Sequence, residues 1–86
     1  WLVHEAYCCH TDIDRYNPHS IHHGTVREAC ATAEHLSVEN LVLYHTEDDD
    51  LAHRKERYLA EGRSVYGGNL HVPDDLEAFE LQRTFA

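Results

Sequence analysis

The feature that most constrains the fold of this chain is the start of a helix at Thr25. Thr25 is placed to cap the helix and Glu28 to reach back to it, which is the pattern of a capping box. The residues that follow repeat apolar side chains at helical spacing: Val26, Ala29, Cys30 and Ala33. We therefore expect a helix that runs to about Leu36 and packs one face against a core.

Apolar runs on both sides of this helix predict two strands. Residues 1–8 predict a buried strand, followed by a polar loop over residues 10–22. Residues 41–44 form a continuous apolar run, which is typical of a strand buried on both faces of a sheet. Because a strand, a helix and a strand in that order form a crossover unit, we expect parallel strands and an α/β fold.

A second helix is expected over residues 51–61, after an acidic run at residues 47–50, since negative charge favours a helix N-terminus. Gly62 should end this helix. Its charged side chains, Arg54 among them, should face solvent. Its buried side chains should be Leu51, Tyr58 and Leu59. Short strands are expected beyond it at residues 64–66, 69–72 and 76–81.

The charge balance is acidic and narrows the choice of partners. The chain has 7 Lys and Arg against 16 Asp and Glu, a formal net charge of -9 with His neutral. Such a surface repels phosphate backbones, so this segment should not be the main grip on a nucleic acid. No stretch has the length of a membrane span and no signal peptide is present, so we expect a cytoplasmic protein that does not bind a membrane.

The three cysteines favour a reducing compartment, because their number is odd and two of them are adjacent. Cys8 and Cys9 should point to opposite faces of a strand, which disfavours a disulfide between them. Together with His10 and later histidines they match no zinc-finger spacing. Five of the nine histidines are expected on the solvated surface: His10, His19, His35, His53 and His71.

Two other histidines fall where parallel sheets collect ligands. His45 directly follows the strand at residues 41–44, and in open α/β sheets ligands bind outside the carboxyl ends of the strands. His23 lies just before the helix at Thr25, so a crossover unit can bring it to the same edge of the sheet as His45. On pattern alone, however, His45 is an ordinary surface histidine after a strand.

Three short motifs, taken in order, resemble those of a known family: His4-Glu5-Ala6-Tyr7, His23-Gly24-Thr25 and Leu43-Tyr44-His45. In the ribonuclease Z-like branch of the metallo-β-lactamase fold, a His-Glu-Ala-Thr motif ends a strand and a His-Ser-Thr motif opens the next helix. An apolar strand then ends in a histidine that ligates metal. Residues 1–81 are similar to the C-terminal third of that αββα sandwich, which implies that residues 1–86 are the C-terminal portion of one such domain.

The resemblance implies a role for each matching residue. His45 would be a ligand of one of two divalent metal ions, which we expect to be zinc. His23 would donate a proton to the leaving group, and Glu5 would orient His23. His22 competes with His23 for the role of proton donor. A neutral imidazole suits zinc, and a histidine held by a carboxylate suits proton transfer to a departing oxygen.

The chain departs from the family pattern in ways that matter. Tyr7 stands where the family has Thr and Gly24 where it has Ser, which weakens the case for processing of tRNA 3′ ends. The His-x-His-x-Asp-His cluster that holds most of the metal pair does not occur in the chain. The sequence opens on the apolar run from Trp1, which we interpret as the inside of a strand already under way. We therefore expect a truncated chain with no activity by itself.

The resemblance favours a phosphodiesterase as the parent protein, acting on a phosphodiester or a small molecule. A nucleic acid would be held through the part of the parent protein that precedes this chain. The resemblance is also compatible with a homodimer. One alternative keeps the fold but changes the substrate to a small ester, a lactone or a cyclic nucleotide. Another alternative is a non-catalytic domain that binds metal loosely through its histidines or serves as an interaction module.

Overall fold

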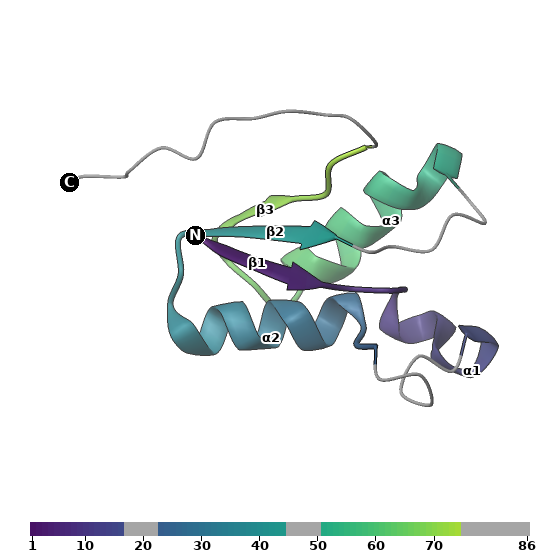
Figure 1. The fold of residues 1–86 in the computed structure, drawn as a ribbon, viewed down its shortest axis with the longest axis horizontal. Helices are drawn as coiled ribbons and strands as arrows, with labels where there is room; N and C mark the ends of the chain where they lie inside the picture. Colours follow the sequence, from purple (N-terminus) through teal and green to yellow (C-terminus); the bar gives the residue numbers. More distant parts are fainter. Residues whose placement is uncertain (17–22, 45–50, 75–86) are drawn as a thin grey trace.

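The computed structural model describes residues 1–16, 23–44 and 51–74, and these form a mixed α/β unit (Figure 1). Its strands are β1 (Leu2–Glu5), β2 (Asn40–Tyr44) and β3 (Asn69–His71). Its helices are the 3-10 helix η1 (His10–Asp12) and the α-helices α1 (Ile13–Tyr16), α2 (Val26–Leu36) and α3 (Leu51–Arg63). The α/β class predicted from the sequence is confirmed. In the described part of the chain, no helix is long and apolar enough to cross a membrane.

The three strands form one parallel sheet in the order β1-β2-β3. Glu5 of β1 lies opposite Tyr44 of β2, and the Ala6 N–H donates to the Tyr44 carbonyl at 3.0 Å. The carboxyl ends of β1 and β2 are therefore side by side. The predicted parallel pairing is confirmed, and it brings the loop after β1 next to the end of β2.

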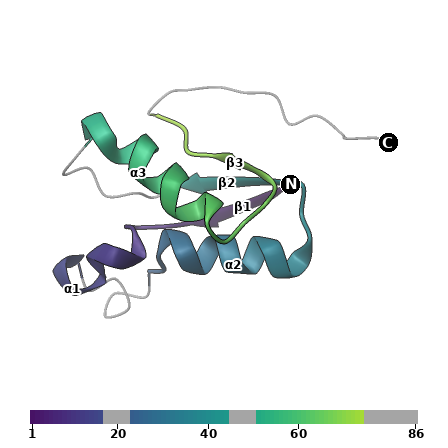
Figure 2. The same ribbon diagram turned by 180° about the vertical axis from the view of Figure 1, so that it is seen from behind.

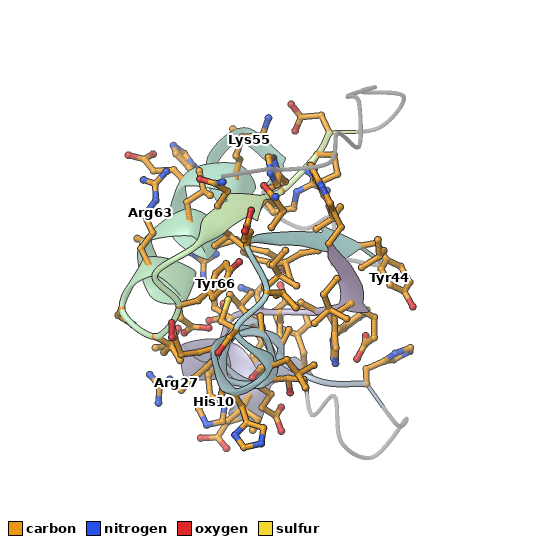
Figure 3. The ribbon with its side chains drawn as sticks, turned by 90° about the vertical axis from the view of Figure 1, so that its left-hand side faces the viewer. His10, Arg27, Tyr44, Lys55, Arg63 and Tyr66 are labelled. Carbon is orange, nitrogen blue, oxygen red and sulfur yellow. The ribbon has the colours of Figure 1, made fainter. Side chains whose placement is uncertain are left out.

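The core lies between the sheet and the two long helices, α2 and α3 (Figures 1 and 2). From β2, Leu41 and Leu43 are 0% and 1% exposed and pack in one cluster with Tyr58 of α3. The apolar run at residues 41–44 is buried as expected except at Tyr44, which is half-exposed. Figure 3 shows Tyr44 on the side of the sheet away from the helices.

Helix α2 confirms the sequence prediction at both ends. The Thr25 hydroxyl accepts the Glu28 N–H at 3.3 Å, while the Glu28 carboxylate accepts the Thr25 N–H at 2.9 Å, so the capping box is formed. The helix ends at Leu36, and Ser37 follows with a φ of 56°. Its buried residues are those of the predicted apolar stripe, Val26, Ala29, Cys30 and Ala33.

Two predictions for the first 16 residues are wrong. The first strand ends at Glu5 rather than at residue 8, and Val3 is 55% exposed rather than buried. Within the part of the chain that the structure describes, β1 lies at an edge of the sheet. Residues 10–16, predicted as part of a loop, form η1 and α1. The Asp12 N–H donates to the Cys9 carbonyl at 2.9 Å, and the Asp12 carboxylate pairs with Arg57 of α3.

Three predictions for α3 and its end are also wrong. The predicted helix is present, but it ends at Arg63 rather than at Gly62, which lies in its last turn where Leu70 and Cys30 approach its backbone. Residues 64–66 form a turn rather than a strand, since the N–H groups of Val65 and Tyr66 both donate to the Gly62 carbonyl. The charged Arg54 is buried, because its guanidinium donates to the Pro73 carbonyl and pairs with Asp74.

Some of the other predictions for residues 47–81 are confirmed, and the rest concern residues that the structure does not describe. Tyr58 is buried and Leu59 packs against the core, as expected. The strand predicted at residues 69–72 is confirmed as β3. The side chain of Leu51, the acidic run at residues 47–50 and the strand predicted at residues 76–81 lie outside what the structure describes.

Candidate functional site

Glu5 and His23 are in direct contact at the carboxyl end of β1. The Nδ1 atom of His23 lies 3.1 Å from Oε2 of Glu5, and the two side chains are 24% and 20% exposed. Because an ionised carboxylate only accepts hydrogen bonds, Nδ1 carries the proton in this contact and Nε2 is the ring nitrogen on the other side. The pairing joins two residues that the sequence analysis selected from separate motifs.

Gly24 holds the second oxygen of the same carboxylate. Its N–H donates to Oε1 of Glu5, so the carboxylate binds two consecutive residues of the loop before α2. A Cβ at Gly24 would lie 3.3 Å from that oxygen, which is tighter than ordinary contact. The absence of a side chain therefore lets the carboxylate approach the backbone closely. Its negative charge also lies near the N-terminus of α2, where the helix dipole favours it.

The backbone on both sides of the loop keeps this contact in register. The Tyr7 N–H donates to the Gly24 carbonyl at 3.0 Å, and the Val26 N–H donates to the Cys8 carbonyl at 2.9 Å. Cys8 and Thr25 form an isolated parallel bridge between these two bonds. The segment after β1 and the segment before α2 therefore run together as a short extension of the sheet.

Aromatic rings pack beside the histidine. The ring of Tyr7 stacks on the imidazole of His23 with centroids 5.3 Å apart and planes 14° apart. Tyr16 meets the ring of Tyr7 edge-on at 5.9 Å, and the Arg15 guanidinium lies 5.0 Å from the centre of the Tyr16 ring. The imidazole thus has a carboxylate at one nitrogen and an aromatic ring against its face.

Helix α3 covers one face of the sheet and supports the site from that side (Figure 2). The Tyr58 hydroxyl donates to the Tyr7 carbonyl at 2.8 Å. The Glu61 carboxylate accepts the His10 N–H at 2.7 Å, and the His10 Nδ1 lies 3.0 Å from the Thr25 hydroxyl that caps α2. Two side chains of α3 therefore fix the chain segment that carries Tyr7 and the N-terminus of α2.

The metal ligand predicted from the sequence, His45, lies outside the described residues, as does His22. His45 follows Tyr44, and Tyr44 lies opposite Glu5 in the sheet. Among residues 1–16, 23–44 and 51–74, no group of three or more His, Cys, Asp or Glu could hold a metal ion. The zinc ion and the role of His45 therefore stay predictions.

The cysteines are buried free thiols that line the core behind the site. Burial, and after it the negative charge of Glu61, raises the pKa of Cys9 to about 12 and that of Cys30 to about 11. At neutral pH both thiols are protonated, and a thiol is neither a metal ligand nor a nucleophile until it ionises. Cys9 and Cys30 therefore serve as small apolar side chains that pack in the core.

Two histidines assigned to the surface are more buried than expected. His10 is half-buried between Glu61 and Thr25, and Figure 3 shows it at the end of the molecule near α2. His71 is half-buried and stacks on Trp1 with ring centroids 5.2 Å apart. His35 and His53 are exposed as expected, and His19 lies outside the described residues.

The supporting residues of the site were not predicted from the sequence. Tyr7 was singled out only as a departure from a family motif, and no role was predicted for Glu61. Their partners are far along the chain, since 51 residues separate Tyr7 from Tyr58 and His10 from Glu61. No periodicity or local motif carries that information. The adjacency of Tyr7 to the Glu5 motif was the one available signal.

Comparison with known proteins links the chain to a nuclease. It is 31% identical over 80 residues to a ribonuclease Z from Thermococcus sibiricus, and the match covers 93% of this chain. The chain spans about a quarter of that relative's length, 24%. No family model matches the chain, and no solved structure matches it. The chain is therefore similar to one region of a ribonuclease Z.

Proposed function

We propose that residues 1–86 are the C-terminal part of a metal-dependent phosphodiesterase of the metallo-β-lactamase fold, in its ribonuclease Z-like branch. The observation that carries the proposal is the 3.1 Å contact between Glu5 and His23. Those two residues were assigned to one catalytic step from motifs 18 positions apart, and they meet at the carboxyl end of a parallel strand. The similarity to a ribonuclease Z supports the same conclusion.

The proposed chemistry of this part is proton donation to the leaving group. Glu5 binds Nδ1 of His23, which fixes the tautomer and aims Nε2 away from the carboxylate. Cleavage of a phosphodiester releases an alkoxide, which is a poor leaving group unless a proton reaches the departing oxygen. Nε2 of a protonated His23 would supply that proton. The proposal includes two divalent metal ions, with zinc expected and His45 as one ligand, and the other ligands would come from outside this chain.

The proposed substrate is a phosphodiester such as RNA, since the named relative is a ribonuclease. The formal net charge of -9 makes this segment a poor surface for a long polyanion. The surface that binds an RNA would therefore come from the remainder of the protein, and this segment would contact the substrate at the scissile phosphate. A small phosphodiester would not need that additional binding surface.

The test compares two substrates with different leaving groups in the complete protein that carries this chain. His23→Gln should lower turnover of an RNA oligonucleotide by roughly 10²–10⁴-fold, because its alkoxide leaving group needs a proton. The same variant should cleave bis(4-nitrophenyl) phosphate almost normally, because 4-nitrophenolate leaves as a stable anion. His53→Gln, on an exposed histidine of α3, is the matched control and should change neither rate.

A second variant tests the metal ligand. His45→Ala should lower bound zinc and should reduce cleavage of both substrates together, since the metal site serves every substrate. Normal RNA cleavage by His23→Gln would show that the proton-donor assignment is wrong, and His22→Gln would then be tested for that role. Full zinc content in His45→Ala would remove His45 from the metal site.

A further inference from the structure

The ring of Tyr7 packs on the face of His23, and the sequence motif does not explain this contact. The two rings are nearly parallel, with planes 14° apart and centroids at 5.3 Å. Tyr16 packs edge-on against the Tyr7 ring with planes 85° apart, so the Tyr7 ring is itself held by an aromatic neighbour. Stacked and edge-on aromatic pairs at these separations are attractive beyond simple burial.

The main chain of Tyr7 is fixed on both of its polar groups. Its N–H donates to the Gly24 carbonyl at 3.0 Å, and its carbonyl accepts the Tyr58 hydroxyl at 2.8 Å. Both bonds use backbone atoms of Tyr7, so they survive any replacement of its side chain except proline. A change of side chain at this position therefore tests the ring without removing the bonds that hold the segment.

The contact with Glu5 does not define the orientation of the imidazole by itself. A hydrogen bond at Nδ1 holds the position of that nitrogen, but it does not by itself set the tilt of the ring about the bond. A flat ring packed against the face of the imidazole opposes that tilt. The two contacts act on different features of the imidazole, the first on the nitrogen that is held and the second on the plane of the ring.

We propose that Tyr7 is a positioning residue, which holds the imidazole of His23 in the plane from which Nε2 reaches the leaving group. This inference rests on the proposed function, because it concerns the orientation of the same proton donor. It predicts that the aromatic ring, rather than the hydroxyl or the bulk of the side chain, carries the effect. Misplacement of a reacting group by about 1 Å can cost on the order of 10²-fold in rate.

The experiment uses two replacements in the complete protein. Tyr7→Leu keeps an apolar side chain of substantial size but removes the ring, and Tyr7→Phe keeps the ring but removes the hydroxyl. With an RNA oligonucleotide as substrate, Tyr7→Leu should lower kcat by roughly 10-fold with KM unchanged, since an orientation effect acts on the chemical step. Tyr7→Phe should retain kcat within about twofold. Cleavage of bis(4-nitrophenyl) phosphate should be unchanged in both variants.

A spectroscopic measurement tests the stack without relying on activity. The ring protons of His23 should show an upfield ring-current shift in the NMR spectrum of the protein, with the resonance assigned by its loss in His23→Gln. The shift should persist in Tyr7→Phe and disappear in Tyr7→Leu. The ring-current shift separates a failure of this inference from a failure of the proposed function, because it needs no turnover.

The outcomes are distinct. If Tyr7→Leu keeps both the ring-current shift and normal kcat, or if Tyr7→Phe loses kcat as severely as Tyr7→Leu, the positioning role is overturned. If His23→Gln leaves RNA cleavage intact while the ring-current shift follows the Tyr7 ring, the proposed catalytic function fails although the stack is real. Loss of kcat only in the variant without the ring, together with loss of the shift, supports the inference.

Discussion

Helices α2 and α3 cover the same sheet, yet they contribute to the candidate site in different ways. Helix α2 starts at the site, since His23 and Gly24 directly precede its cap at Thr25. Helix α3 contributes no residue to the Glu5–His23 contact but reaches the segments around it through Tyr58 and other side chains. Helix α2 presents the proposed chemistry, and α3 holds its surroundings in place.

The two helices also differ in what they bury. Helix α2 buries small or apolar side chains at regular spacing, and its start is fixed by contacts between residues three apart. Helix α3 buries Arg54 and Tyr58 and brings Gly62 against Cys30 of α2. Its packing therefore depends on partners in distant parts of the chain. We therefore expect substitutions at the buried face of α3 to lower the stability of the protein more than the weak apolar pattern of this helix indicates.

The largest expected effect is at Gly62 of α3, which lies close to Cys30 of α2. In an ordinary helix Gly→Ala gains about 1 kcal/mol of stability. A Cβ at Gly62 would instead overlap Leu70 and lie 2.9 Å from the Cys30 Sγ. We expect Gly62→Ala to lower the free energy of unfolding by about 1–2 kcal/mol, as measured by chemical denaturation.

Gly67→Ala is the matched control for that substitution. Among the described residues, a Cβ at Gly67 would come within 4 Å of Glu34 alone, at 3.7 Å from its Oε1, and Gly67 is exposed. Its effect on stability should be within about 0.5 kcal/mol. A stabilising Gly62→Ala would show that α2 and α3 are not in close contact there. It would contradict the view that the packing of α3 depends on contacts with distant parts of the chain.

A smaller effect is expected at Tyr58, whose hydroxyl joins α3 to the site. Tyr58→Phe keeps the buried ring but leaves the Tyr7 carbonyl without that donor. We expect the free energy of unfolding to fall by about 1 kcal/mol, the usual cost of such a lost bond. Tyr44→Phe, at a half-exposed tyrosine, should have no measurable effect. Equal stabilities of the two variants would mean that α3 does not support the site through this bond.

The same contrast explains how much could be predicted from the sequence. The capping box, the apolar stripe of α2 and the parallel pairing of β1 with β2 follow from neighbours in the chain, and all three are confirmed. These three features need only local signals and one topological rule. The pairing of Glu5 with His23 was expected from the family resemblance instead, and the structure places the two side chains in contact.

The wrong predictions have long-range causes. Arg54 lies among charged residues whose pattern predicts exposure to solvent, but it is buried and contacts Pro73 and Asp74, about 20 positions away. Glycine is a residue type that often ends helices, but Gly62 lies within the last turn of α3. The side chain of Leu70 approaches so closely there that no Cβ would fit without a shift. Tertiary contacts of this kind override local propensity, and a single sequence does not contain them.

The smallest expected effect near neutral pH comes from the buried thiols of Cys9 and Cys30. The pKa of Cys30 is raised from 9.0 to about 11 and that of Cys9 to about 12, by burial and then by Glu61 of α3. The folded protein therefore holds these protons more tightly than the unfolded chain does. Stability should be unaffected below pH 9 and should fall as the pH rises from 9 through 11 to 12.

Denaturation curves over this alkaline range test the thiols, and two variants divide the cause. Cys30→Ala removes one of the two thiols and should make the loss of stability with pH shallower. Glu61→Gln keeps an acceptor for the His10 N–H but removes the charge, so it should reduce the slope only slightly, because burial is the larger cause for both thiols. A slope that disappears in Glu61→Gln would show instead that the charge of α3, and not the close packing of α2 against it, controls the ionisation of these cysteines.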